Sequence, residues 1–217
     1  MEIVIASKRR RVREIYLNDG GEPALNFINT CKKDGKGGYI DRLTNYSTFI
    51  NWCAGSNLID HDRWLILDLE QYCYMHEAKQ IYSEVLSARN CMDELFNCLA
   101  SGMEVHSLIL ERFDVLALAI RPHLRYENAP HGVALYWHAV AEEMNLPLWL
   151  IISSACKLID SGERHKLKKC PVCGSLFLDR TRASNKRWCN PNTCGSLQKS
   201  NKYYALKNAK NRPEIAF

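Results

Sequence analysis

A long apolar run is missing from this sequence, and no stretch approaches the roughly eighteen residues that a membrane-spanning helix needs. At the N-terminus only Ile3-Val4-Ile5 precedes the basic cluster that begins at Lys8, which is too short and in the wrong order for a signal peptide. Internal repeats and low-complexity tracts are also absent. We therefore expect a cytoplasmic globular protein without a membrane partner, in which cysteines stay reduced or bind metal.

Acidic residues are scarce in the last quarter of the chain. Residues 162–217 hold thirteen Lys and Arg against three Asp and Glu, a net charge of +10, whereas the remaining 161 residues have a net charge of −5. The formal net charge of the whole chain, +5, hides this division into an acidic body and a basic segment. Such asymmetry predicts a polyanionic partner for the basic segment alone.

No recognised catalytic constellation is present either. The histidines stand apart from any nucleophile or carboxylate in a known catalytic spacing: His61, His76, His106, His123, His131, His138 and His165. Glu142-Glu143 is a carboxylate pair, but it is more simply the polar face of the segment before Asn145. We therefore expect the histidines to be core or surface residues, and we expect that the protein is not an enzyme.

Cysteine, in contrast, is abundant, and four of the ten cysteines form a regular pattern. Their spacing is C-x2-C-x15-C-x4-C, which suits a tetrahedral zinc site built from two close pairs. A disulfide framework is the alternative, and it is disfavoured because nothing in the sequence is typical of a secreted protein. The pattern predicts one structural Zn²⁺ held by Cys170, Cys173, Cys189 and Cys194.

Each cysteine pair also has turn-forming neighbours. In the first pair Pro171 fixes one backbone angle, and Gly174 can adopt the positive φ that closes the turn. In the second pair Asn190 can cap a helix, and Pro191 suits the first position of that helix. Two pairs of sulfurs can therefore be aimed at one point.

The other six cysteines lie among apolar residues with helical spacing: Cys31, Cys53, Cys73, Cys91, Cys98 and Cys156. A second metal site could form from Cys73 and His76, which are one helical turn apart. Core packing is the better interpretation, because free cysteine is among the most buried residue types.

Most of the sequence before residue 162 has the apolar spacing of helices. Apolar residues recur at intervals of three and four from Tyr46 to Ala54, from Asp62 to about Leu99, and from Val105 to Ile120. The second stretch is long for one helix, and we expect it to break near Arg89-Asn90. A last helix is predicted from Leu148 to Ile159.

Other patterns mark the parts of the chain that are not helical. After Pro122, apolar and polar residues alternate on either side of Glu127–Gly132, which predicts a β-hairpin. Three glycines in residues 35–38 predict a flexible loop. The fold class is therefore α+β, with three parts: a basic and partly disordered N-terminus (1–21), a mainly helical domain with one β-hairpin (22–161) and a basic zinc finger (162–217).

Within the finger, Ser175–Asp179 is expected to be a strand and Lys186–Trp188 the returning strand, with a turn between them. A closing helix from about Pro191 to Lys210 would carry the last two ligands. A knuckle, a hairpin and a helix in this order are typical of a treble-clef-like finger.

Aromatic residues interleave with the positive charges of the finger. Guanidinium and ammonium groups bind phosphates, while rings pack on sugars or base edges. A solvated surface is the alternative, but such a surface normally mixes both signs of charge. The expected nucleic-acid contacts are Arg180, Arg182, Lys186, Arg187, Trp188, Lys199, Lys202 and Lys207.

The sequence around the cysteines resembles the CGNR zinc finger of bacteria. The resemblance rests on Cys173–Asp179, Arg180, Arg182, Asn185–Cys189 and Cys194-Gly195. In that family the finger follows an ABATE domain, and the proteins are described as stress-induced transcription regulators. Earlier segments resemble the ABATE domain, so that the resemblance spans about residues 22–207: Leu25–Thr30, Asp41-Arg42-Leu43, and Ser154-Ala155 with Leu158-Ile159.

The sequence departs from this family in three places. Two residues separate the first cysteine pair where members usually have four, although both spacings can ligate zinc. The naming motif Cys-Gly-Asn-Arg is Cys194-Gly195-Ser196-Leu197, and leucine cannot replace arginine on a phosphate. Asn26 stands where an aspartate is common, which puts an ionic role at that position in doubt.

The resemblance and the charge pattern together predict a DNA-binding transcription regulator. Four thiolates fill the coordination shell of the zinc and leave no open position for water, so its role is structural. The helical body would sense a small-molecule effector or form a homodimer. The alternative function is a zinc-stabilised RNA-binding or protein-interaction module without sequence-specific DNA recognition, because basic clusters bind any phosphate backbone.

Overall fold

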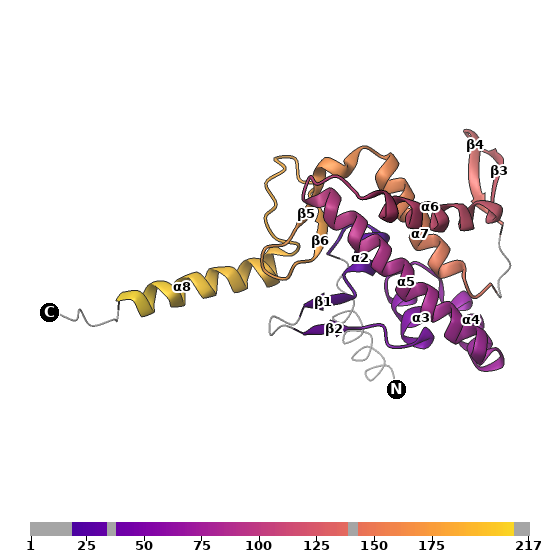
Figure 1. The fold of residues 1–217 in the computed structure, drawn as a ribbon, viewed down its shortest axis with the longest axis horizontal. Helices are drawn as coiled ribbons and strands as arrows, with labels where there is room; N and C mark the ends of the chain where they lie inside the picture. The colour runs from indigo at the N-terminus through magenta and orange to yellow at the C-terminus, as the bar shows by residue number, and fades with distance from the viewer. Residues whose placement is uncertain (1–18, 34–37, 139–142, 211–217) are drawn as a thin grey trace.

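The computed structural model describes residues 19–33, 38–138 and 143–210 (Figure 1). A mainly helical body with small antiparallel strand pairs precedes the cysteine cluster, which confirms the α+β class. The basic N-terminus up to residue 18, most of the predicted glycine loop and Glu142 lie outside the described residues. Within the described part, none of the helices combines the length and apolarity that crossing a bilayer requires.

The predicted helices of the body are present, with small shifts at their ends. Helix α3 begins in a capping box, in which the Asn45 side chain accepts a hydrogen bond from the Thr48 N–H at 2.8 Å. The helices of the body are α2 (Pro23–Ile28), α3 (Tyr46–Gly55), α4 (His61–Cys73), α5 (Met75–Ala100), α6 (Ser107–Ile120) and α7 (Leu146–Asp160).

The expected helix break near Arg89-Asn90 is wrong, because the chain breaks at Tyr74 instead. Tyr74 ends α4 by donating to the Glu70 carbonyl, and its own carbonyl accepts from Ala78 at the start of α5. No glycine or proline lies at this position, so the sequence contains no helix-breaking residue that would predict it. Helix α5 continues through Arg89, whose side chain is buried against the strands described next.

Two strand pairs lie in the described part of the body, where the sequence predicted one. The predicted hairpin is present as β3 (Leu124–Ala129) and β4 (Gly132–Trp137). The unpredicted pair is β1 (Cys31–Lys33) with β2 (Tyr39–Asp41), which are too short to show an alternating pattern. Arg89 fixes this pair to α5, because its guanidinium binds both carboxylate oxygens of Asp41 and donates to Thr30 Oγ1 at 2.8 Å.

One hydrophobic core extends through the body and across the predicted boundary at residue 161. Its fully buried members from the body include Phe27, Phe49 and Phe96. Leu167, Leu176 and Leu178, which follow the boundary, belong to the same cluster. The first half of the finger is therefore built on the body, whereas the last helix extends away from it (Figure 1).

Candidate metal centre and basic surface

The first cysteine pair lies in the connection between strands β5 (Leu167–Lys169) and β6 (Leu176–Leu178). The strand predicted at Ser175–Asp179 is present as β6, but its expected pairing with Lys186–Trp188 is wrong. Strand β6 pairs with β5, and Lys186–Trp188 forms no strand. The turn itself closes as predicted. Gly174 has a φ of +74°, and its N–H donates to the Cys170 carbonyl at 2.9 Å.

The second cysteine pair lies at the start of the closing helix, as predicted. The Asn190 side chain accepts from the Asn192 N–H at 2.8 Å, and Pro191 occupies the first position of the turn. This turn, η3 (Pro191–Gly195), is π-helical and continues into α8 (Ser196–Lys210). Asn190 and Pro191 together orient the last two sulfurs toward the knuckle.

The four predicted ligands come together in one cluster. All four Sγ atoms lie within 4.8 Å of one another, and the pairs Cys173–Cys189 and Cys189–Cys194 are separated by 3.6 and 3.7 Å. A tetrahedral site with Zn–S bonds of about 2.3 Å has edges of about 3.8 Å, so the sulfurs are spaced as zinc requires. Two ligands are almost fully buried and two are half-buried, which suits a closed structural site.

Hydrogen bonds in the cluster favour a thiolate at Cys173. Its contact with the Cys189 sulfur, and after it the Ser175 hydroxyl 3.1 Å away, holds the pKa of Cys173 below its ordinary value, although burial opposes the shift. The same contact with Cys173 raises the pKa of Cys189 well above its ordinary value. Zinc binds thiolates, so the arrangement already provides the charge state that the metal needs at one ligand.

A small second core surrounds the sulfurs. Phe177 is fully buried against Cys170 and Cys189, and Trp188 packs on the same cluster. The Trp188 ring packs over Gly195, where an added Cβ would lie in van der Waals contact, 3.4 Å from the ring. The expected nucleic-acid contact at Trp188 is therefore a half-buried packing residue, with one ring face near the Arg187 guanidinium.

Asp179, which is fully buried, organises the basic loop after β6. Its carboxylate accepts from Lys168 Nζ at 2.6 Å, from the Lys186 N–H at 2.8 Å, and from the N–H and hydroxyl of Thr181. Burial raises the pKa of Asp179, but these donors outweigh it and hold the pKa below its usual range. Lys168 also donates to the Ser184 carbonyl at 2.7 Å, so the two side chains fix the loop from within.

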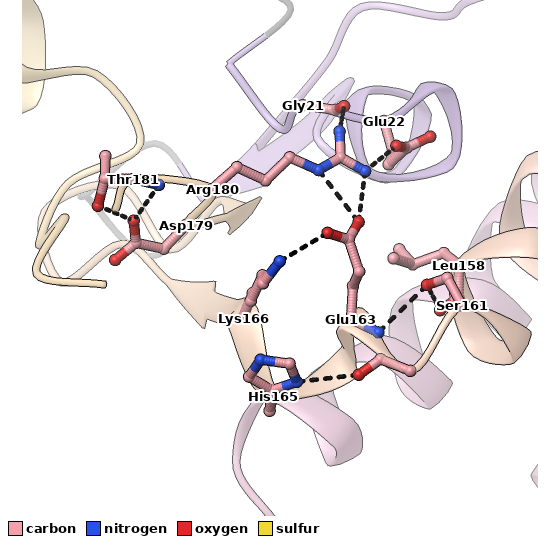
Figure 2. A network of polar contacts seen from close by, with 11 residues as sticks. Gly21, Glu22, Leu158, Ser161, Glu163, His165, Lys166, Asp179, Arg180 and Thr181 are labelled. Atoms are coloured by element: carbon pink, nitrogen blue, oxygen red, sulfur yellow. Dashed lines mark hydrogen bonds and ion pairs between the residues drawn. The ribbon is translucent and has the colours of Figure 1, made fainter. Parts of the chain in front are cut away.

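Arg180, expected to bind phosphate, instead joins the finger to the body. Its guanidinium pairs with Glu163 at 2.7 Å and with Glu22, and it donates to the Gly21 carbonyl at 3.2 Å (Figure 2). Hydrogen bonds from Arg180 and then from Lys166 lower the pKa of Glu163 to about 2. These intramolecular partners remove Arg180 from the set of free cations.

The other predicted cations stay on the surface, in two groups. Arg182 and Arg187 are exposed on the loop that Asp179 organises, and the Lys186 ammonium lies 5.1 Å from the centre of the Phe177 ring. Lys199, Lys202 and Lys207 are exposed on α8. A basic loop thus precedes Cys189 and a basic helix follows Cys194.

Body and finger also meet around a cleft of about 310 Å³. Cys31 and Asp93 line it from the body, and Lys169 and Cys173 line it from the finger. Lys169 Nζ donates to the Asn97 side chain at 2.7 Å across the junction. A molecule in this cleft would touch both parts of the chain.

Residues 166–207 match the model of the CGNR zinc finger family. A search of the curated proteins found no match. The match covers the metal centre, the basic loop and most of α8, and together with the sulfur geometry it identifies a zinc-binding finger. The departure at Ser196-Leu197 is on the surface, where Leu197 is 52% exposed at the start of α8.

Two residues that organise the basic loop were not predicted from the sequence: Lys168 and Asp179. Each binds a residue that is distant in the sequence or a backbone group. Such contacts leave no periodic pattern in the sequence. Asp179 had one available signal, because it is one of only three acidic residues after residue 161. An isolated carboxylate in a basic segment is a candidate for an internal partner.

Proposed function

We propose that the protein is a DNA-binding transcription regulator, in which the zinc finger presents helix α8 and the basic loop to the phosphate backbone. The observation that carries this proposal is α8 itself. Every residue from Ser196 to Lys207 is exposed, and the fifteen residues of α8 include no Asp or Glu. A helix that is exposed around its circumference and carries only one sign of charge is well suited to a polyanion.

The dimensions and direction of α8 support duplex DNA as the partner. Fifteen residues make a helix of about 22 Å, and an α-helix fits the major groove of B-DNA. The helix extends away from the body (Figure 1), so the acidic part of the chain need not approach the duplex. Lys199, Lys202 and Lys207 supply the phosphate contacts, and Arg182 and Arg187 add contacts from the loop.

Zinc serves this function by holding the two basic elements in place. Four thiolates complete its coordination, so its chemistry is structural. Cys170 and Cys173 belong to the hairpin that is packed on the body, while Cys189 and Cys194 precede α8. The metal would therefore fix the starting point of α8 relative to the body.

Regulation by the body follows from the contacts between the two parts. We propose, in line with the resemblance to ABATE proteins, that the helical body senses a small-molecule effector. Support comes from the cleft lined by Asp93 and Lys169, because a ligand there would contact α5 and the strand next to Cys170. Such a ligand would change the position of the finger without touching DNA.

The test is fluorescence anisotropy with a labelled random-sequence duplex over a range of salt concentrations. Each neutralised phosphate contributes about 0.9 to the slope of log affinity against log salt. Replacing Lys199, Lys202 and Lys207 together with Gln should flatten the slope by up to about 2.7, and Arg182→Ala with Arg187→Ala by up to about 1.8. Lys79→Gln, at an exposed position on α5, is the control and should leave the slope unchanged.

RNA binding is the second candidate, and one observation favours it. Tyr203 and Tyr204 on α8 are 62% and 61% exposed, and exposed rings stack on unpaired bases. Tyr203→Ala with Tyr204→Ala should weaken binding to single-stranded RNA while leaving duplex DNA binding nearly unchanged. Tighter binding to RNA than to DNA at equal salt, lost in this variant, would replace the DNA proposal.

A further inference from the structure

Helix α6 carries apolar residues on two sides, yet the body covers only one of them. The covered stripe packs against the core and consists of Ile109, Phe113, Leu116 and Ile120. On the opposite side Leu108, Val115 and Leu118 are 57%, 67% and 69% exposed. A helix that is apolar on both sides is ordinarily buried on both. We call this second side the outer stripe of α6.

The hairpin that follows α6 also has an uncovered apolar face. The register of β3 with β4 places Tyr126, Leu135 and Val133 on one face of the hairpin, together with Leu124. Near the base, Leu124 is buried in the core, whereas farther out Tyr126 and Val133 are 67% and 68% exposed. A two-stranded hairpin is marginally stable by itself and needs a third strand or a helix on its apolar face. The outer half of this hairpin lacks such a cover within the described residues.

The two uncovered surfaces lie at the same end of the body. Only the short helix η1 (Arg121–His123) separates α6 from β3, and the hairpin stands clear of the helices at the end opposite α8 (Figure 1). We propose that this end is the contact surface of a homodimer, in which hairpin β3–β4 of one copy lies on the outer stripe of α6 of its partner, and reciprocally.

Length and charge favour a second copy as the occupant. Strands of six residues span about 20 Å, and the fourteen residues of α6 span about 21 Å, so the hairpin can cover the stripe. The exposed Glu111 lies within the stripe, between Leu108 and Leu118, and the exposed Asp114 lies beside it, while the base of the hairpin carries Arg121 and Arg125. Docking the hairpin on the helix of another copy brings these opposite charges together.

The area available also suits a dimer. Six large apolar side chains of the two surfaces are each at least 44% exposed: Leu108, Val115, Leu118, Tyr126, Val133 and Leu135. At on the order of 100 Å² apiece, they offer on the order of 600 Å² per copy, close to the roughly 800 Å² per partner of a standard interface. A two-fold contact would bury both surfaces of both copies at once. This surface is independent of nucleic-acid binding.

Sedimentation velocity of the full chain with zinc, over a wide range of protein concentration, tests the proposal. The wild type should form a dimer. Leu118→Glu on α6 and Val133→Glu on β4 should each raise the dissociation constant at least about tenfold, because each places an unpaired charge in the contact. Ile40→Glu, at a 57% exposed position on β2, is the matched control and should dimerise like the wild type. Circular dichroism and zinc content show whether each variant is folded.

Mixing the two dimerisation variants tests the hairpin-on-helix arrangement. In a mixed dimer both glutamates fall in one of the two contacts, and the other contact keeps its original residues. The mixture should therefore associate more tightly than either variant alone. A wild type that stays monomeric throughout, or variants that dimerise normally, would overturn the surface. Weakened variants without rescue on mixing would overturn the hairpin-on-helix contact.

Discussion

The side-chain amide of Asn29, at the end of α2, pairs with both backbone groups of Leu176 on β6. Asn29 Nδ2 donates to the Leu176 carbonyl at 2.8 Å, and Asn29 Oδ1 accepts from the Leu176 N–H at 2.9 Å. Both residues are buried. Asn29 thus continues the hydrogen bonding of a strand edge and fixes the residue that follows the zinc knuckle to the body.

Replacing Asn29 should destabilise the whole molecule. Asn29→Ala leaves a buried N–H and a buried carbonyl without partners, and we expect a loss of about 2 to 4 kcal/mol in the free energy of unfolding. Asn29→Asp keeps the acceptor but places a buried carboxylate oxygen against the Leu176 carbonyl, so its loss at pH 7 should be at least as large. Urea unfolding followed by circular dichroism measures both. Equal stability of Asn29→Ala and wild type would mean that the body and the finger are joined mainly by the shared apolar core.

Zinc removal should loosen the two cysteine turns and leave strands β5 and β6 in place. One zinc per chain is expected by mass spectrometry, and Cys189→Ser should lose it, whereas Cys73→Ser, at an exposed cysteine on α4, should keep it. Hydrogen exchange after chelation should show faster exchange at the Gly174 and Gly195 amides, which close the two cysteine turns.

The Leu178 amide is the internal reference for that experiment. It donates to the Gly20 carbonyl at 3.0 Å, and Leu178 belongs to the common core. Its exchange should therefore stay slow without zinc. If the Leu178 amide loses protection together with Gly174, the strands depend on the metal, and the finger folds as one unit with its zinc.

Asp179 should be required for the order of the basic loop. Asp179→Asn keeps the size of the side chain but removes the charge that Lys168 needs as its partner. We expect lower stability and faster exchange of the Thr181 and Lys186 amides, both of which donate to this carboxylate. Lys168→Met should produce a similar change. Unaltered exchange at both amides would show that the loop holds its shape without the buried ion pair.

The sequence predicted the features that depend on local spacing. The ligand set, the turn at Gly174 and the amphipathic helices each rest on residues a few positions apart, and these predictions are confirmed. The predicted partner of β6 was wrong. The sequence of Leu167–Lys169 is as suitable for a strand as that of Lys186–Trp188, and only packing against the body distinguishes the two.

Contacts between residues that are distant in the sequence could not be predicted either, because local spacing does not encode them. Arginine is a residue type that often binds phosphate, but Arg180 pairs with Glu22, which lies 158 positions earlier in the chain. The break of the long helix at Tyr74 depends on backbone angles that no glycine or proline announces. Local chemistry therefore predicted the metal centre, and tertiary contacts decided which cations remain free.

The Glu163–Arg180 contact should give a defined pH dependence. The pKa of Glu163 in the folded chain is lowered to about 2, from an ordinary value of 4.5, because Arg180 and Lys166 donate to its carboxylate. A group with a lowered folded pKa contributes stability that is fully present above the unfolded value and is lost as the pH falls through the folded value. Glu163 should therefore contribute fully from neutral pH down to about 4.5 and progressively less toward pH 2.

The stability difference between the wild type and Glu163→Gln isolates this contribution, because both chains have the same cysteine cluster and its titration cancels in the difference. The difference should be constant between pH 7 and pH 5 and should shrink below about pH 4.5. Arg180→Gln should remove most of it at every pH, since the carboxylate then keeps only Lys166 as a partner. High salt should reduce the difference, because the contact lies near the surface. A difference that already declines between pH 7 and pH 5 would mean that the Glu163 carboxyl is protonated more easily than an ordinary one, and that Arg180 does not hold it.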